Sequence, residues 1–174
     1  MKKNVVLIAN PVSGGMDKAE IITATALYAA KEGFGYFLFE TTGNADDKKI
    51  KEIYNTLKPE RIIIAGGDGT IKLVVEALAK VDVVFGILPA GSANGLATDL
   101  NLPKTLEENL YICFHGDHIE LDIVEINGKK CLHLSDLGLN ATLIKNYENN
   151  AVHGKLGYAL QVINTLIDME APFR

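Results

Sequence analysis

The stretch "IIIAGGDGT", residues 62–70, decides how this chain folds. Its β-branched apolar residues run directly into glycines that surround one carboxylate, Asp68. A short apolar run that ends at glycine is typical of a strand buried on both faces, and such strands belong to parallel sheets. A turn needs only one glycine, so three glycines around an aspartate indicate that another group approaches the backbone closely.

The rest of the chain alternates short apolar runs with longer segments of helical period. Strands are predicted at residues 5–10, 36–40, 61–65 and 83–89, and helices at 18–31, 46–57, 71–80 and 105–114. This order is typical of an α/β fold in which helices cover a parallel sheet. We therefore predict an α/β domain over residues 1–117, with its ligand at the carboxyl ends of the strands.

The pattern changes after Gly116. Residues 118–128 alternate like a strand and enter an Asn-Gly turn, from which residues 129–139 return, so a β-hairpin is predicted. A predicted helix at 155–169 follows. One hairpin and one helix cannot close a sheet domain, so residues 118–174 are predicted to begin an antiparallel β domain that has been cut short. The apolar stripe of the helix, left uncovered, would favour a homodimer.

Composition narrows the class of protein. The chain has 174 residues and a net charge of −5, which argues against a broad nucleic-acid surface, so no nucleic acid is expected as a partner. Cys113 and Cys131 lack the paired spacing of a zinc site or redox motif and are expected to be reduced thiols of a cytoplasmic protein. The apolar run near the N-terminus is about five residues long, too short for a signal peptide or a membrane span.

Loops rich in small polar residues follow all four predicted strands. They read "NPVSGG" (10–15), "TTGNAD" (41–46), "GGDGT" (66–70) and "PAGSANG" (89–95). Such loops expose backbone N–H groups next to the positive ends of helices, which favours phosphate binding. Each loop taken alone is better explained as an ordinary turn, but four at one edge of a sheet favour a phosphate site.

Asp68 would lie unfavourably beside an anion unless a divalent cation separates them or the carboxylate orients a nucleophile. Both roles occur in phosphoryl transfer. Neither common nucleotide fingerprint is present, because the chain has no G-x-x-x-x-G-K-[ST] and its glycines at 66, 67 and 69 are not spaced as G-x-G-x-x-G. The sequence predicts a phosphate site with a different signature.

Three motifs in this order, "NPVSGG", "GGDGT" and "LPAGSANGLA", resemble the catalytic domain of the diacylglycerol kinase family, which includes bacterial lipid kinases and the sphingosine and ceramide kinases. The motif "GGDGT" alone is shared with NAD kinases. The resemblance spans residues 4–139. It implies a Rossmann-like nucleotide-binding domain (1–117), a C-terminal β-sandwich domain of which 118–174 would be a part, and ATP in the cleft between them.

The resemblance also implies a set of site residues, carried over by position. The nucleotide site would comprise Asn10, Pro11, Ser13, Gly14, Thr41, Gly66, Gly67, Asp68, Gly69, Thr70, Ser92 and Asn94. Asp68 would be the catalytic residue that holds Mg²⁺ near the transferred phosphate. Asp122 matches an acidic position that faces the cleft from the second domain and would be the other metal ligand; an ordinary strand-surface acid is an equal alternative for it.

The chain departs from the family pattern in three ways. Lys72 and Leu73 stand where the family usually has Asn-Glu, with Glu76 one turn further on, and Gly95 replaces an aspartate that is common among the lipid kinases. The family's proposed general base, a glutamate, belongs to a C-terminal portion that this chain lacks. We therefore expect the chain itself to be weakly active or inactive.

The sequence thus predicts an ATP- and Mg²⁺-dependent lipid kinase fold that transfers the γ-phosphate to a hydroxyl of a diacylglycerol- or sphingoid-like lipid. Its partners would be ATP and a lipid at the membrane surface, reached from the cytoplasm by peripheral contact. Two alternatives stay open: an NAD kinase-like enzyme, and a nucleotide-binding or regulatory module without catalysis. The lipid acceptor is left open.

Overall fold

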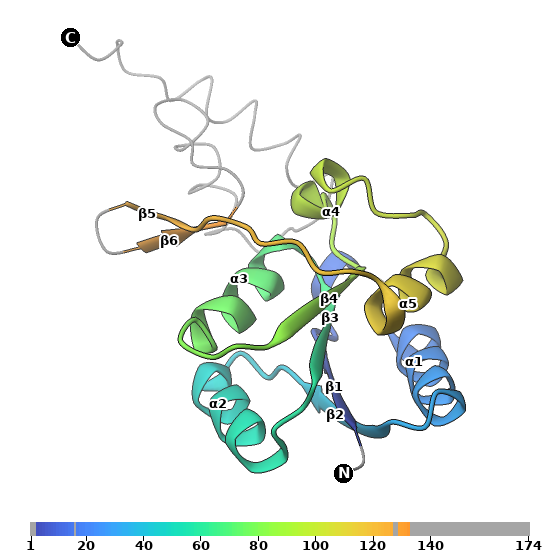
Figure 1. Cartoon of the computed structure of the whole chain (residues 1–174). Helices are drawn as coiled ribbons and strands as arrows, with labels where there is room; N and C mark the ends of the chain where they lie inside the picture. The colour runs from blue at the N-terminus through green and yellow to red at the C-terminus, as the bar shows by residue number, and fades with distance from the viewer. Residues whose placement is uncertain (1–2, 16, 127–128, 133–174) are drawn as a thin grey trace, which may run out of the picture. The chain divides into compact units, whose positions relative to one another are not determined.

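The computed structural model describes residues 3–15, 17–126 and 129–132 (Figure 1). Its main sheet has four strands, β1 (Asn4–Ala9), β2 (Gly35–Glu40), β3 (Arg61–Gly66) and β4 (Val84–Pro89). The strands lie in the order β2-β1-β3-β4, and every neighbouring pair is parallel. The predicted α/β fold with a Rossmann-like parallel sheet is therefore confirmed.

Helices connect the strands and cover both faces of the sheet (Figure 1). They are α1 (Ala19–Lys31), α2 (Asp46–Leu57), α3 (Asp68–Ala77), α4 (Gly95–Asp99) and α5 (Leu106–His115), with a 3₁₀ turn at Ser13–Gly15. Helix α2 has the same first and last residues as the predicted helix at 46–57. Helix α3 begins three residues before the predicted 71, because Asp68 and Gly69 form its first turn instead of a loop.

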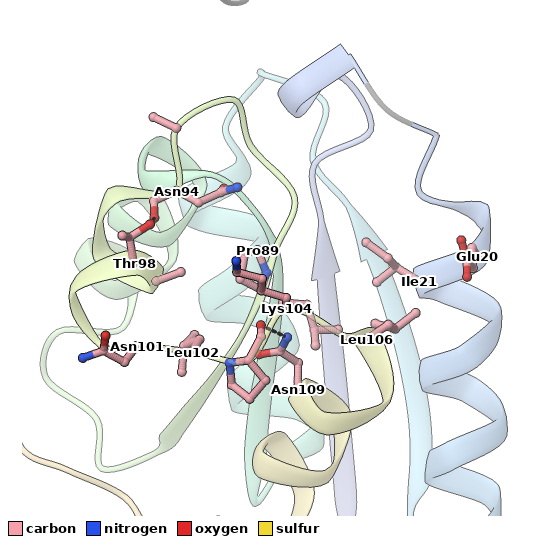
Figure 2. A pocket seen from close by; sticks show the side chains of 14 residues that line it. Glu20, Ile21, Pro89, Asn94, Thr98, Asn101, Leu102, Lys104, Leu106 and Asn109 are labelled. Atoms are coloured by element: carbon pink, nitrogen blue, oxygen red, sulfur yellow. Dashed lines mark hydrogen bonds between the residues drawn. The ribbon is translucent and has the colours of Figure 1, made fainter.

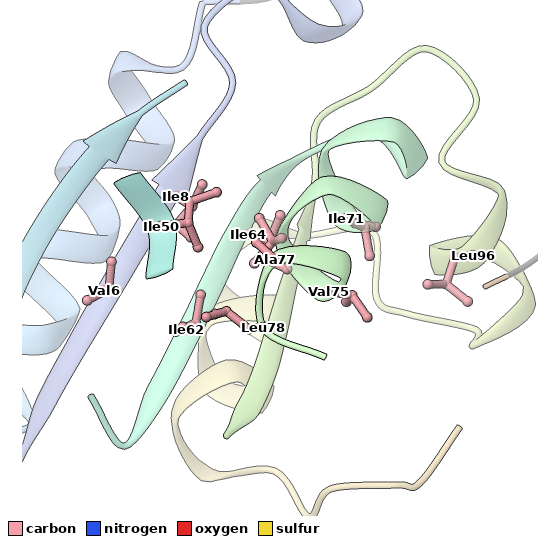
Figure 3. Packing of buried hydrophobic residues seen from close by; sticks show 11 residues of the cluster. Val6, Ile8, Ile50, Ile62, Ile64, Ile71, Val75, Ala77, Leu78 and Leu96 are labelled. Carbon is pink, nitrogen blue, oxygen red and sulfur yellow. The ribbon is translucent and has the colours of Figure 1, made fainter. Parts of the chain in front are cut away.

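The core consists of two layers, one on each face of the sheet. In β3, Ile62 and Ile64 pack toward α2 and α3, while Ile63 and Ala65 pack toward α1 and α5. Figure 3 shows the first of these layers, with Ile62 and Ile64 beside Leu78 and Ala77 of the α3 region. Successive side chains of a strand point to opposite faces, so burial on both faces explains why "IIIA" is apolar at every position.

The order of the strands fixes where the site can lie. From β1 the chain first adds β2 on one side and then β3 on the other, so the topology switches between β1 and β3. In open α/β sheets, ligands bind outside the carboxyl ends of the strands at such a switch point. Asn10 follows β1, and Gly67 follows β3. These two loops thus lie at the position where open α/β sheets bind their ligands.

A two-stranded antiparallel sheet follows, formed by β5 (Val124–Ile126) and β6 (Lys129–Cys131). The predicted first strand, 118–128, is much longer than β5, and that prediction is wrong for residues 118–123. Ile119, Leu121 and Ile123 supply the apolar alternation, yet all are exposed. Alternation produces a strand only where a neighbour takes up the backbone hydrogen bonds, and no neighbouring strand pairs with this segment in the described part of the chain.

The predictions for residues 133–139 and for a helix at 155–169 lie outside the described residues. The boundary between predicted domains 1–117 and 118–174 stays a prediction. In the part of the chain that the structure describes, no helix is long and apolar enough to cross a membrane.

Candidate functional site

The first loop is joined to the third across the switch point. Asn10 follows β1 directly, and its Nδ2 donates a hydrogen bond to Thr70 Oγ1 at 3.1 Å. Its Oδ1 accepts a hydrogen bond from the backbone N–H of Val12 at 3.1 Å. Thr70 is buried in the first turn of α3. The amide of Asn10 therefore fixes the first loop to the start of the helix that follows "GGDGT".

The first loop also contacts the fourth. The hydroxyl of Ser13 lies 3.0 Å from Ala90 O and 3.1 Å from Asn10 O, and its single proton is shared between these two acceptors. Gly14 has φ of 64°, in the left-handed region. A Cβ at this position would lie 2.8 Å from Ala90 O. Both the conformation and the close approach to the fourth loop require glycine at position 14.

The third and fourth loops pack backbone against backbone. A Cβ at Gly91 would lie 2.4 Å from Gly67 Cα, closer than real Cβ atoms come to other heavy atoms. A Cβ at Gly66 would meet Thr70 Oγ1 at 2.5 Å. Gly69, in contrast, is exposed, and a Cβ there would meet nothing within 4 Å. Packing within the protein thus requires glycine at positions 66 and 91 and leaves little room at Gly67, where a Cβ would lie 3.0 Å from Gly91 Cα, whereas Gly69 leaves open space.

Asp68 binds the start of helix α4. Its Oδ2 accepts a hydrogen bond from Gly95 N at 2.9 Å, and its Oδ1 accepts one from Leu96 N at 3.0 Å. The first N–H groups of a helix have no partner within the helix, so a carboxylate at this point satisfies two of them. The side chain is half-buried. Asp68 therefore organises the fourth loop, whatever else it binds.

Asn94 closes the fourth loop. Its Oδ1 accepts a hydrogen bond from Gly91 N at 2.7 Å, and its Nδ2 donates one to Gly91 O at 3.0 Å. Its backbone has φ of 55°, a left-handed conformation that asparagine adopts more readily than most residues. Both polar atoms of this predicted nucleotide ligand are thus engaged with Gly91, the residue that touches Gly67.

The second loop is organised by Asp46, which the sequence did not single out. This carboxylate is buried and accepts hydrogen bonds from the backbone N–H groups of Thr42, at 3.0 Å, and Gly43, at 2.7 Å, and from the Thr42 hydroxyl at 2.9 Å. Burial raises the pKa of Asp46, but these donors and the charge of Lys49 outweigh burial and leave the pKa below its usual value. Thr41, a predicted site residue, is also buried, and its N–H bonds Ala9 O at 2.9 Å.

The remaining predicted residues are exposed. Pro11 lies in the first loop and Ser92 in the fourth loop, and these two loops are joined by the hydrogen bond from Ser13 to Ala90 O. Asp122 is exposed in the segment that precedes β5. Among the described residues, no group of three or more His, Cys, Asp and Glu side chains is arranged to hold a metal ion. The structure does not bring Asp122 into such a group with Asp68.

Mg²⁺ is the ion that the resemblance implies, and Asp68 is the residue that fits it. Each carboxylate oxygen of Asp68 accepts one N–H and has a further lone pair for a cation. Mg²⁺ is commonly held by one or two carboxylates together with substrate phosphates and water. Position 95 carries no side chain that could add a second ligand, because it is glycine. The residues therefore fit a cation that binds together with a phosphate ligand, through a single carboxylate.

A cavity of about 620 Å³ lies beside the fourth loop, among residues of α1, β4, α4 and α5 (Figure 2). Asn109 lines it and donates hydrogen bonds to Pro103 O at 2.7 Å and Thr105 O at 2.8 Å. Of the predicted site residues, all of which the structure describes, Asn94 alone contributes to this cavity. The cavity is thus separate from the meeting point of the first and third loops.

Comparisons with known proteins identify the family of this chain. Residues 4–126 match the sequence model of the diacylglycerol kinase catalytic domain. This match covers most of the chain, and the chain therefore belongs to the diacylglycerol kinase catalytic domain family.

Three relatives illustrate the match, and all three are bacterial proteins. A protein of Pectobacterium atrosepticum named "Probable lipid kinase YegS-like" is 30% identical, over 98% of this chain and 58% of its own length. "Probable lipid kinase YegS" of Escherichia coli is 29% identical, over 80% of this chain and 48% of its own length. A solved structure of a diacylglycerol kinase from Bacillus anthracis superposes with a TM-score of 0.62 and 25% identity, over 74% of this chain and 47% of that one. The chain spans about half the length of the relatives it matches.

Proposed function

We propose that this chain is the nucleotide-binding part of a lipid kinase that transfers the γ-phosphate of ATP to a hydroxyl group of a diacylglycerol- or sphingoid-like lipid. The observation that carries the proposal is the hydrogen-bonded junction of the first, third and fourth loops at the switch point of the sheet. The names of the relatives, lipid kinases and a diacylglycerol kinase, support a lipid as the acceptor.

In the reaction, the lipid hydroxyl oxygen forms a bond to the γ-phosphorus while the bond from that phosphorus to the bridging β-oxygen breaks. Backbone N–H groups of the loops and the first turn of α3 neutralise charge on the phosphates. Asp68 would hold Mg²⁺, and this ion would supply positive charge beside the phosphates. The hydroxyl proton goes to the base that the resemblance assigns to the C-terminal portion of the family.

The proposed nucleotide site keeps the residues assigned from the resemblance. It comprises Asn10, Pro11, Ser13, Gly14, Thr41, Gly66, Gly67, Asp68, Gly69, Thr70, Ser92 and Asn94. Their roles differ in this proposal. Gly69 leaves room for a phosphate, Asp68 meets the metal, and Asn94 holds the fourth loop in shape. Asp122 is proposed to approach the metal from a second domain that begins near residue 118.

The proposal is tested by the binding of ATP and by transfer of its phosphate. We expect Mg²⁺-ATP to raise the melting temperature of the chain and EDTA to reverse most of that increase. Asp68→Asn should weaken binding of Mg²⁺-ATP, while Glu76→Gln, an equal change of charge at an exposed position of α3, should not. Millimolar Mg²⁺-ATP that leaves the melting temperature unchanged would contradict the nucleotide site.

Phosphate transfer is measured with labelled ATP and the protein at the full length of its relatives, offered a total lipid extract and NAD in parallel. Label in a lipid is the expected result. Label in NAD would identify an NAD kinase-like enzyme instead. Binding of ATP without label in either acceptor would favour a nucleotide-binding module.

A further inference from the structure

Lys18 is a buried lysine next to the proposed phosphate loops. It immediately precedes α1 and is only 3% exposed. Its ammonium group donates a hydrogen bond to the backbone carbonyl of Ser13 at 2.6 Å. Lysine is rarely buried, because removing an ammonium group from water costs free energy unless it is well paired. The hydrogen bond to Ser13 O offsets part of this cost and ties the ammonium group to the first loop.

The bond from Lys18 is the first of a series that crosses three loops. Ser13 in the first loop bonds through its hydroxyl to Ala90 O in the fourth loop at 3.0 Å. The N–H of Ala90 donates to Gly66 O, at the end of β3, at 2.9 Å. The series Lys18–Ser13–Ala90–Gly66 thus connects the start of α1 to the fourth and third loops. Displacing its first member would leave Ser13 without its charged partner.

Fixing the carbonyl of Ser13 also fixes a donor. The peptide bond between Ser13 and Gly14 is trans, since the described residues contain no cis peptide bond. The C=O and the N–H of a trans peptide point in opposite directions. An ammonium that holds the Ser13 carbonyl on one side therefore directs the Gly14 N–H to the other side.

The side chain of Lys18 is less accessible to water than those of the other lysines near the loops, Lys49 and Lys72. The four loop sequences contain no lysine or arginine. Lys72 lies on the exposed side of α3, and Lys49 reaches the second loop through Thr42 Oγ1 at 3.0 Å. Burial lowers the pKa of Lys18, and the charge of Asp17 opposes this shift. A cation with little access to water attracts an anion more strongly than an exposed one.

We propose that Lys18 is a positioning residue for phosphate binding, which holds Ser13 so that the first loop presents its backbone to the phosphates of the nucleotide. This inference rests on the proposed function, because it needs a nucleotide at these loops. Lys18 acts through Ser13 and Gly14, because it directs the Gly14 N–H toward the phosphates. Its loss should therefore weaken binding of the phosphates and not of the nucleoside.

The test compares Lys18→Met with Lys18→Arg and with Lys72→Met, a matched loss of charge at an exposed position. Dissociation constants are measured for Mg²⁺-ATP and for adenosine on the same chain. Lys18→Met should weaken ATP binding by about 10- to 100-fold, the size expected for a charge-assisted hydrogen bond, and leave adenosine within about threefold. Lys18→Arg should recover part of the loss, and Lys72→Met should behave like the unchanged chain.

The outcomes separate this inference from the proposed function. Failure of the unchanged chain to bind ATP would overturn both. Binding of ATP by Lys18→Met at the unchanged affinity would overturn the role of Lys18 alone. An equal loss of ATP and adenosine would also overturn it, since a purely structural lysine would act on both. Should Lys18→Met fail to fold, Lys18→Gln, which also removes the charge, decides instead: unchanged ATP affinity in that variant would overturn the role of Lys18.

Discussion

Asp68 Oδ2 accepts a hydrogen bond from the N–H of Gly95 at 2.9 Å, although the two residues lie 27 positions apart in the chain. The N–H of Leu96 donates a second hydrogen bond, to Asp68 Oδ1 at 3.0 Å, so each carboxylate oxygen accepts one backbone N–H. The aspartate of "GGDGT" thus has a structural role that is independent of any ligand. Substitution of Asp68 consequently affects folding as well as binding, and the two effects have to be measured separately.

We predict that Asp68→Ala lowers the free energy of unfolding by about 1–3 kcal/mol, because two N–H groups at the start of α4 lose a charged acceptor. Urea unfolding without nucleotide measures this change. Glu76→Ala, at an exposed position of α3, is the control and should change stability by less than about 0.5 kcal/mol. Equal stability of the Asp68 variant and the control would show that the contact with α4 contributes nothing.

Two glycine substitutions should behave in opposite ways. Gly91→Ala places a Cβ 2.4 Å from Gly67 Cα and should destabilise the protein by about 2 kcal/mol or more, because backbone cannot move aside as a flexible side chain can. Gly69→Ala meets nothing within 4 Å and should leave stability unchanged or slightly higher, since alanine favours helix.

The same two substitutions distinguish a glycine that packing requires from a glycine that leaves room for a ligand. On the proposed function, Gly69→Ala reduces affinity for Mg²⁺-ATP while the melting temperature of the free protein is retained. Titration of both variants with Mg²⁺-ATP checks this. Full ATP affinity in Gly69→Ala would show that no phosphate approaches this residue.

The carboxylate of Asp46 should make stability depend on pH. Its pKa is below the usual value in the folded protein, so its contribution is present above the ordinary aspartate pKa of about 4 and is lost as the pH falls through the lower, folded value. We expect Asp46→Asn to be less stable than the unchanged chain by about 1–3 kcal/mol at pH 7, with the difference shrinking below pH about 4. Denaturant unfolding across this range measures it. Asp82→Asn, at an exposed position, should show little difference at any pH.

The two cysteines should differ in reactivity. Cys113 is buried, and burial raises the pKa of its thiol to about 12, so very little thiolate forms at pH 8. Cys131 is partly exposed. Iodoacetamide at pH 8 should therefore label Cys131 in the folded protein and Cys113 only after unfolding, as followed by mass spectrometry. Equal labelling of the two residues in the folded state would contradict the packing of Cys113 against the sheet.

Sequence patterns predicted the sheet and its long helices well, because burial on both faces leaves a strong local signal. "IIIA" in β3 is the clearest case, since its alternate residues serve two different core layers. Helix α4 has no such signal. Its five residues are stabilised from outside, through the Asp68 carboxylate, and a contact between distant positions leaves no trace in local periodicity.

Loop composition indicated where a site could lie, and the structure adds contacts that composition does not reveal. Gly66 and Gly67 suggested a bare backbone for a ligand, but their missing side chains make room for Thr70 and Gly91. Lys18 escaped notice because a lysine beside a helix is normally solvated, and only the folded structure shows it buried against Ser13. Residues 118–123 alternate in the same local way but form no strand, and no strand among the described residues pairs with them.

The contact between Gly67 and Gly91 has a consequence for the thermodynamics of binding. Loops that are locked together by Asn10, Ser13 and Asp68 have already lost their conformational entropy when the chain folds. A ligand that enters here meets a preorganised surface, and little of its binding free energy is spent on ordering loops. On the proposed function, a substitution that loosens the loops should lower nucleotide affinity mainly through an entropic penalty, which calorimetry measures, with the binding enthalpy largely retained.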